Sequence, residues 1–360
     1  MIEKLKRVGI VGKVKDWIHD WIRGRKQRVR VEGEKSEWIE VISSVIQGSV
    51  LGGSLFDIFI DDIREVVLDA LILLFADDTK VALRIQSEED CQKFQRIIDN
   101  LAEWAKSWEM EFNQKKCKII HVGHNNPGRD YYMNGVKIET TTEEKDLGVW
   151  IQPNLKPKKQ CASVVKNANF ALGQISRAFH FRKKSTLVPI YKTFIRPKLE
   201  FAAAAWSPWT EGEKNLIEKV QERFIRMLSD VKGNTYEEKL RDAGLTRLEE
   251  RRERGDAIET FKTMNGFNRV NKDKWFKLEE DDARPTRRNA EVTEEGVKKK
   301  THVLKMESAR LEVRKNFYNV RAAKAWNEIP QAVKEQTSVN AFKNAYDRWK
   351  MDAKNNATVQ

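Results

Sequence analysis

The sequence is poor in cysteine and proline, and it has no long apolar run. Its 360 residues include 3 cysteines and 8 prolines. Cys91, Cys117 and Cys161 are too few and too far apart for a disulfide framework or a zinc site, so we expect an intracellular, reducing compartment, nucleus or cytoplasm. No apolar stretch reaches the length of a transmembrane helix and no cleavable signal opens the chain, so we expect no membrane partner.

Acidic residues are also in the minority. Asp and Glu number 54 against 67 for Lys and Arg, which gives a net charge of +13. A surplus of this size favours a polyanionic partner, nucleic acid before membrane. A soluble basic surface with no particular partner is the alternative. The length predicts two or three packed domains.

The stretch that organises the chain is residues 71–83, L-I-L-L-F-A-D-D-T-K-V-A-L. Two apolar runs of strand length flank Asp77 and Asp78, which predicts a β-hairpin with both carboxylates at its tight turn. Adjacent carboxylates repel each other unless a cation lies between them, and Mg²⁺ typically takes one or two carboxylates plus substrate phosphates. For an Asp-Asp pair taken alone, a solvated acidic turn is the alternative.

Several blocks in the sequence resemble one family. Residues 75–78, F-A-D-D, resemble the [YF]-x-D-D box of reverse transcriptases in the form found in non-LTR (LINE-type) retrotransposons. Residues 47–52, Q-G-S-V-L-G, resemble the P-Q-G-S-x-L-G-P block that precedes this box. Further similar blocks begin at Asn113, Leu147, Leu199 and Trp326, in the family's order. The resemblance runs from near Met1 to about Lys350 and implies the C-terminal part of the polymerase region.

The resemblance implies roles for particular residues. Asp77 and Asp78 would be catalytic and bind Mg²⁺, and Lys116 would lie near the incoming triphosphate, where an ammonium stabilises or protonates the leaving pyrophosphate. A basic loop without such a role is the alternative for Lys116. RNA template, DNA primer and dNTPs would be the partners. The residues expected to contact nucleic acid or nucleotide are Gln47, Gly48, Ser49, Phe75, Ala76, Leu147, Gly148, Lys158 and Lys159.

One part of the family's site has no counterpart in this sequence. In the family a second metal-bridging Asp belongs to a D-x-x-x-A-F-D block, which in relatives stands shortly before the residues that match Glu3-Lys4-Leu5-Lys6. No carboxylate in the chain is spaced to replace it, so we expect weak Mg²⁺ binding and little or no activity from the isolated chain. The chain also departs from the family at Ser44, Ile46 and Gly53, where relatives have Gly, Pro and Pro.

Two other interpretations stay open. The chain can be a non-catalytic, basic nucleic-acid-binding remnant of such an element, with salt-dependent and sequence-tolerant binding. It can also be an incomplete gene product that does not fold alone.

The expected fold is α+β. We expect a partial polymerase palm at 1–152, an antiparallel sheet with helices, followed by a helical thumb at 153–233 and a helical extension at 234–271. A charged linker at 272–300, a C-terminal helical region at 301–350 and a tail at 351–360 complete the chain. In detail we expect one helix at 1–22, a strand at 145–151, buried Trp17, Trp21 and Trp38, and a packing role for the block at Trp326.

Overall fold

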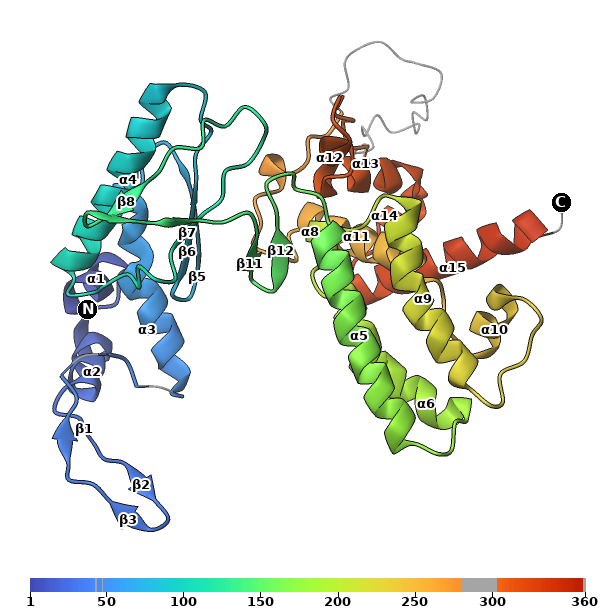
Figure 1. The fold of residues 1–360 in the computed structure, drawn as a ribbon, viewed down its shortest axis with the longest axis horizontal. Coiled ribbons are helices and arrows are strands. Elements are labelled where there is room, and N and C mark those ends of the chain that lie inside the picture. The colour runs from blue at the N-terminus through green and yellow to red at the C-terminus, as the bar shows by residue number, and fades with distance from the viewer. Residues whose placement is uncertain (43, 47, 280–302, 359–360) are drawn as a thin grey trace, which may run out of the picture. The chain divides into compact units, whose positions relative to one another are not determined.

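The computed structural model describes residues 1–42, 44–46, 48–279 and 303–358. They form two compact units, Met1–Thr142 and Glu143–Gln360. Figure 1 shows strands and helices mixed in the first unit and mainly helices in the second. The α+β class is therefore confirmed. The first compact unit ends ten residues before position 152, where the sequence predicts the end of the palm, and the palm boundary itself stays a prediction.

The helices of the first unit are α1 (Ile2–Arg7), α2 (Gly12–Ile22), α3 (Val50–Ile60), the 3₁₀ helix η1 (Asp61–Val66) and α4 (Glu88–Ser107). Residues of α3, η1 and α4 share an apolar cluster with one face of the main hairpin. The single helix expected at 1–22 is two helices, because Gly9 between them and Gly12 at the start of α2 adopt positive φ of 83° and 62°. The side chain of Ser87 caps α4 and that of Asp90 reaches back to the Ser87 amide, which forms a capping box.

The strands of the first unit form separate two-stranded ribbons. They pair as β1 (Lys26–Gln27) with β4 (Ile39–Glu40), β2 (Arg30–Val31) with β3 (Glu34–Lys35), β5 (Leu71–Phe75) with β6 (Asp78–Ala82), β8 (Tyr132–Met133) with β9 (Val136–Lys137), and β7 (Lys118–Ile119) in parallel with β10 (Glu139–Thr140). The continuous antiparallel sheet that we expected is therefore not found among the described residues. Outside β5–β6 the paired segments are only two residues long, too short to build a wider sheet.

Three apolar clusters form the interior of the first unit. Leu5, Ile18 and Leu55 join the first three helices, and two further clusters lie along α4. The expectation for the tryptophans is only partly right. Trp21 packs against the first cluster, but Trp17 and Trp38 are 54% and 56% exposed.

The second unit begins with a hairpin where we expected one strand. β11 (Glu144–Asp146) pairs with β12 (Val149–Ile151), and Leu147 and Gly148 form the two-residue loop. Both loop residues have positive φ, 44° and 88°, as type I′ turns require. The strand prediction was wrong because Leu147 is not a residue typical of such turns.

The first core of the second unit joins the helices that follow. These are α5 (Lys158–Ala178), α6 (Lys184–Ile190), the π-helical segment η2 (Tyr191–Ile195), α7 (Arg196–Glu200), α8 (Ala203–Trp206), α9 (Glu211–Met227) and α10 (Tyr236–Asp242). Helix α5 contributes the stripe Cys161, Val164, Ala168 and Leu172, which faces Val220 and Phe224 of α9 within one cluster.

The second core contains α11 (Leu248–Met264), the 3₁₀ turn η3 (Lys272–Lys274), α12 (Glu312–Lys315), α13 (Tyr318–Glu328), α14 (Gln331–Lys334) and α15 (Val339–Thr358). Trp326 and Phe342, from the two C-terminal sequence blocks, are 1% and 0% exposed, so the packing role expected of them is confirmed. Helix α15 continues through most of the predicted tail. Residues 272–279 of the predicted linker pack here through buried Phe276, and residues 280–302 lie outside the described part.

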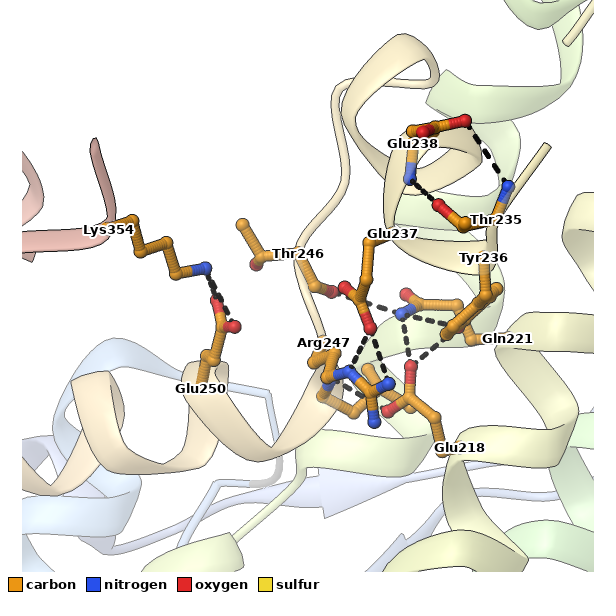
Figure 2. A network of polar contacts seen from close by, with 11 residues as sticks. Glu218, Gln221, Thr235, Tyr236, Glu237, Glu238, Thr246, Arg247, Glu250 and Lys354 are labelled. Carbon is orange, nitrogen blue, oxygen red and sulfur yellow. Dashed lines mark hydrogen bonds and ion pairs between the residues drawn. The ribbon is translucent and has the colours of Figure 1, made fainter. Parts of the chain in front are cut away.

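A polar network ties α9 to the first residue of α10 and to the segment that follows α10 (Figure 2). Glu218 is 6% exposed and accepts hydrogen bonds from the Tyr236 hydroxyl at 2.6 Å, Gln221 Nε2 at 2.9 Å and the Leu248 amide at 2.9 Å. Burial, together with the charge of Glu218, raises the pKa of Tyr236. Because these buried polar groups satisfy one another, the network fixes the start of α11 on α9.

Candidate functional site

The hairpin β5–β6 carries the two predicted carboxylates. Its strands pair in antiparallel register from Leu71↔Ala82 to Phe75↔Asp78, which leaves Ala76 and Asp77 as the loop. Ala76 has a φ of 49°, and two-residue loops that match strand twist favour positive φ. The hairpin prediction is confirmed, with Asp77 in the loop and Asp78 as the first residue of β6.

The two faces of this hairpin differ. Ile72, Leu74 and Val81 pack on the cluster that contains Ile63 and Trp104. Successive side chains of a strand point to opposite faces, so Leu71, Leu73 and Phe75 lie on the other one. These three residues are 57%, 49% and 64% exposed. Phe75 is paired with Asp78, so the Asp78 side chain lies on this open face beside an exposed ring.

The carboxylates nearby do not complete a metal site. Within the described residues there is no group of three or more His, Cys, Asp or Glu side chains that could hold a metal ion. Asp61 pairs with Arg64 at 3.1 Å, and Asp62 accepts from Lys4 at 2.9 Å and from Trp104 Nε1 at 3.0 Å. Two carboxylates alone are too few to clamp two metal ions, so the described residues do not supply a complete two-metal site.

Lys4 is a buried residue that the sequence reasoning passed over. It is 3% exposed, and its ammonium lies 3.5 Å from the Trp108 ring centroid and 4.3 Å from that of Phe59. With the ion pair to Asp62, these contacts fix α1 against η1. The signal in the sequence was only a lysine in an amphipathic helix, which is ordinarily solvated.

The turn before α3 has the geometry expected of the Q-G-S block. Gly48 has a φ of 79°, and Ser49 Oγ accepts from the Gly52 amide at 3.1 Å and donates to the Ile46 carbonyl at 2.7 Å. A Cβ added at Gly52 would lie 2.9 Å from the Ile46 oxygen, so the turn is closely packed. Gln47 lies outside the described residues.

Lys116 lies on an exposed turn of the first unit. Its amide donates to the Asn113 carbonyl at 2.9 Å. Phe112, just before the turn, packs on the same cluster as Ile72 of the hairpin. The predicted place of Lys116 beside the incoming triphosphate stays a prediction.

The remaining predicted contacts belong to the second unit. Leu147 is 49% exposed at the β11–β12 turn, and a Cβ added at Gly148 would lie 3.0 Å from the Phe201 ring. Lys158, the first residue of α5, is exposed. Lys159 pairs with Glu143 at 2.7 Å and lies 4.7 Å from the Trp150 ring centroid, so its charge already supports the hairpin.

No helix among the described residues is both long and apolar enough to span a bilayer.

Comparison with known proteins agrees with the blocks read from the sequence. The family described as "Reverse transcriptase (RNA-dependent DNA polymerase)" matches residues 1–161. The chain is 28% identical over 226 residues to the RNA-directed DNA polymerase from mobile element jockey of Drosophila funebris, and 26% identical over 226 residues to that of Drosophila melanogaster. It is 22% identical over 221 residues to the probable RNA-directed DNA polymerase from transposon X-element of Drosophila melanogaster.

Each of these alignments covers 59% of this chain and 24% of the relative, so the chain spans about a quarter of the length of the curated relatives it matches. No solved structure matches it. Residues 1–161, which contain the hairpin with Asp77 and Asp78, are therefore similar to the reverse transcriptase family, and these relatives are RNA-directed DNA polymerases of mobile elements.

Proposed function

We propose that this chain is the C-terminal part of the polymerase region of a LINE-type RNA-directed DNA polymerase. The first unit would be part of the palm and the helices from α5 onward the thumb. The observation that carries the proposal is the exposed Asp77-Asp78 pair at the tip of β5–β6, inside the matched residues 1–161. Substrates would be an RNA template, a DNA primer and dNTPs.

The chain's own residues would divide the work as follows. Asp77 and Asp78 would hold Mg²⁺, which when bound supplies Lewis-acid stabilisation of the phosphates. Gly48 lets the backbone approach a base or phosphate closely because it has no Cβ. The Lys116 ammonium would offset charge on the leaving pyrophosphate.

In the second unit, the exposed turn at Leu147 and Gly148 would contact the primer end. Lys158 would contact backbone phosphate, which needs charge but no sequence reading. Lys159 is engaged with Glu143, so it would act mainly by holding β11–β12 in place.

We further propose that the isolated chain does not extend primers. Two-metal nucleotidyl transfer needs more carboxylate ligands than Asp77 and Asp78, and the described residues offer no larger group of ligands. The direct test measures Mn²⁺ binding by electron paramagnetic resonance, with Mn²⁺ as a substitute for Mg²⁺. We expect one weak site that Asp77→Asn or Asp78→Asn abolishes and that the exposed control Asp57→Asn keeps. Binding that is unchanged in both hairpin variants would reject the site.

Primer extension on an RNA template with Mg²⁺ tests activity separately. We expect no product from the chain alone. Robust incorporation that Asp77→Ala leaves intact would contradict both the site and the expected inactivity.

A second candidate is a non-catalytic nucleic-acid-binding remnant. The incomplete metal set and the net charge of +13 favour it. It predicts salt-dependent binding to single strands that Asp77→Asn leaves unchanged, together with no Mn²⁺ site at the hairpin. Fluorescence anisotropy that detects no binding at low salt would remove it.

A further inference from the structure

The second core of the second unit has a pocket of about 350 Å³ beside α13, far along the sequence from the hairpin site. Trp275, at its rim, is 38% exposed and lies parallel to Phe317, with an interplanar angle of 4° and ring centroids 6.3 Å apart. The next residue, Phe276, is 5% exposed and anchors the segment in the core. The Trp275 ring therefore stays partly exposed to solvent, while the neighbouring Phe276 ring is buried.

Two lysines lie opposite each other on the same rim. Leu278 and Leu304 form an antiparallel bridge, and the Lys305 amide donates to the Lys277 carbonyl at 2.8 Å. Residues directly opposite across such a pair point to the same side, so both ammonium groups face one way, and both residues line the pocket. Within the described part of the chain neither side chain has a hydrogen bond or an ion pair. Like charges placed this way repel, and an anion bound between them relieves the repulsion.

Two asparagines of α13 hold this rim in place. Asn319 Nδ2 donates to the Trp275 carbonyl at 3.2 Å. Asn327 accepts from the Leu304 amide at 2.9 Å and donates to its carbonyl at 2.8 Å, as a neighbouring strand would. Both asparagines lie on α13, which the buried Trp326 anchors in the core, so the backbone that carries Trp275 and the two lysines is held in place.

We propose that this pocket binds one nucleotide of a single-stranded nucleic acid, with the base stacked on Trp275 and the phosphate between Lys277 and Lys305. Exposed rings beside cationic side chains are the combination that binds single strands, because every base has a π-face and every nucleotide a charge. The volume lies at the small end of ligand pockets and suits one base, not a duplex. An acidic polypeptide would use the lysines and leave the ring unused. The site does not depend on metal at Asp77.

Photocrosslinking of the full chain locates the contact. The probe is an 8-nucleotide single strand with one 5-iodouridine, made as RNA and as DNA, irradiated with the chain and mapped by mass spectrometry. We expect the adduct on Trp275 or Phe317 with either backbone. Adducts confined to other residues would overturn the proposal.

Variants then test the two halves of the site by fluorescence anisotropy with the same strand. Trp275→Ala should weaken binding at least about fivefold and Trp275→Phe should recover most of it, since an aromatic face remains. The double variant Lys277→Gln/Lys305→Gln should lower the slope of log K against log salt by about 1.4, the value for two lost phosphate contacts on a single strand.

The matched control is Lys219→Gln/Lys232→Gln, which removes the same charge from two exposed positions of the same unit. An equal loss of slope in this control, or displacement of the strand by poly-glutamate at the same charge concentration as readily as by unlabelled strand, would overturn the proposal. Circular dichroism of each variant confirms that the fold is kept.

Discussion

Ser44, Ala76 and Leu147 each have a left-handed backbone without being glycine, with φ of 75°, 49° and 44°. An L-residue in this region costs roughly 1–2 kcal/mol. All three lie in or next to blocks that resemble the family's functional turns. Backbone strain persists only where the surrounding structure stabilises it, and strained residues cluster at functional sites.

At Ser44, the departure from the family's Gly should lower the free energy of unfolding by a measurable amount. The family block that this stretch resembles has Gly there, and Gly adopts a φ of 75° without strain. We expect Ser44→Gly to raise the free energy of unfolding of the first unit by about 0.5–1 kcal/mol, the relief of strain less the added entropy of the unfolded chain. Urea denaturation measures it.

The control is Ser54→Gly, at an exposed helical position of α3, which should lower the same quantity by about 0.5–1 kcal/mol. A loss of stability in Ser44→Gly as large as that of the control would show that the left-handed backbone is not strained.

At the scale of elements, α10 is a short helix whose start depends on one capping box. Thr235 Oγ1 accepts from the Glu238 amide at 3.2 Å, and the Glu238 carboxylate accepts from the Thr235 amide at 3.3 Å (Figure 2). The Asn234 amide also donates to this carboxylate at 2.6 Å. The two backbone hydrogen bonds to the carboxylate hold the pKa of Glu238 below its ordinary value of 4.5. A carboxyl with a lowered folded-state pKa stabilises the fold above its unfolded pKa, and that contribution is lost as the pH falls through the folded value.

The Glu238 carboxylate should therefore contribute to the acid sensitivity of the second unit below about pH 4.5. Glu238→Gln keeps the capping geometry but does not titrate. We expect the urea midpoint to fall less between about pH 7 and about pH 3.5 in this variant than in the unaltered chain. Thr235→Ala should instead cost about 1 kcal/mol at both pH values. An equal pH-dependent fall in Glu238→Gln and the unaltered chain would contradict the assignment.

Elements specified by local signals were predictable from the sequence. Asp77 follows a five-residue apolar strand, and Asn134-Gly135 has the two positive φ values that its sequence predicts, 51° and 76°. The β11–β12 hairpin was missed because Leu147 adopts a conformation that its residue type disfavours. Exposed Trp38 was missed because hydrophobicity does not say whether a partner surface covers a ribbon.

Long-range pairing was the other limit. The isolated ribbons of the first unit could not be read from strand patterns, since those patterns do not say which strands meet. The position of Asp77 and Asp78 at the tip of a hairpin was predictable, because both lie within one local motif, and their role as a metal site stays a prediction. The Lys4–Asp62 pair joins residues 58 positions apart in the sequence, and the hydrophobic periodicity of either helix does not predict it.

At the scale of the whole chain, each compact unit has its own buried clusters. We expect two thermal transitions in calorimetry, because two-state behaviour is a property of single domains. Trp326→Ala, at a fully buried position of the second unit, should lower the free energy of unfolding of one transition by roughly 3–5 kcal/mol.

The control is Ile63→Ala, at a position 2% exposed in the first unit, which should lower the other transition by roughly 2–5 kcal/mol. A single transition that both substitutions shift would show that the chain unfolds as one cooperative body.

The uncovered side of the β5–β6 ribbon also governs how the chain behaves in bulk solution. Leu71, Leu73 and Phe75 present a hydrophobic strip whose strand edges can template pairing with other chains. Each molecule carries a net charge of +13, so electrostatic repulsion between molecules opposes this aggregation at low ionic strength, and added salt weakens that repulsion. Sulfate salts also strengthen apolar association. We therefore expect turbidity on adding salt to depend on this strip and on the charge excess as well as on the stability of the fold.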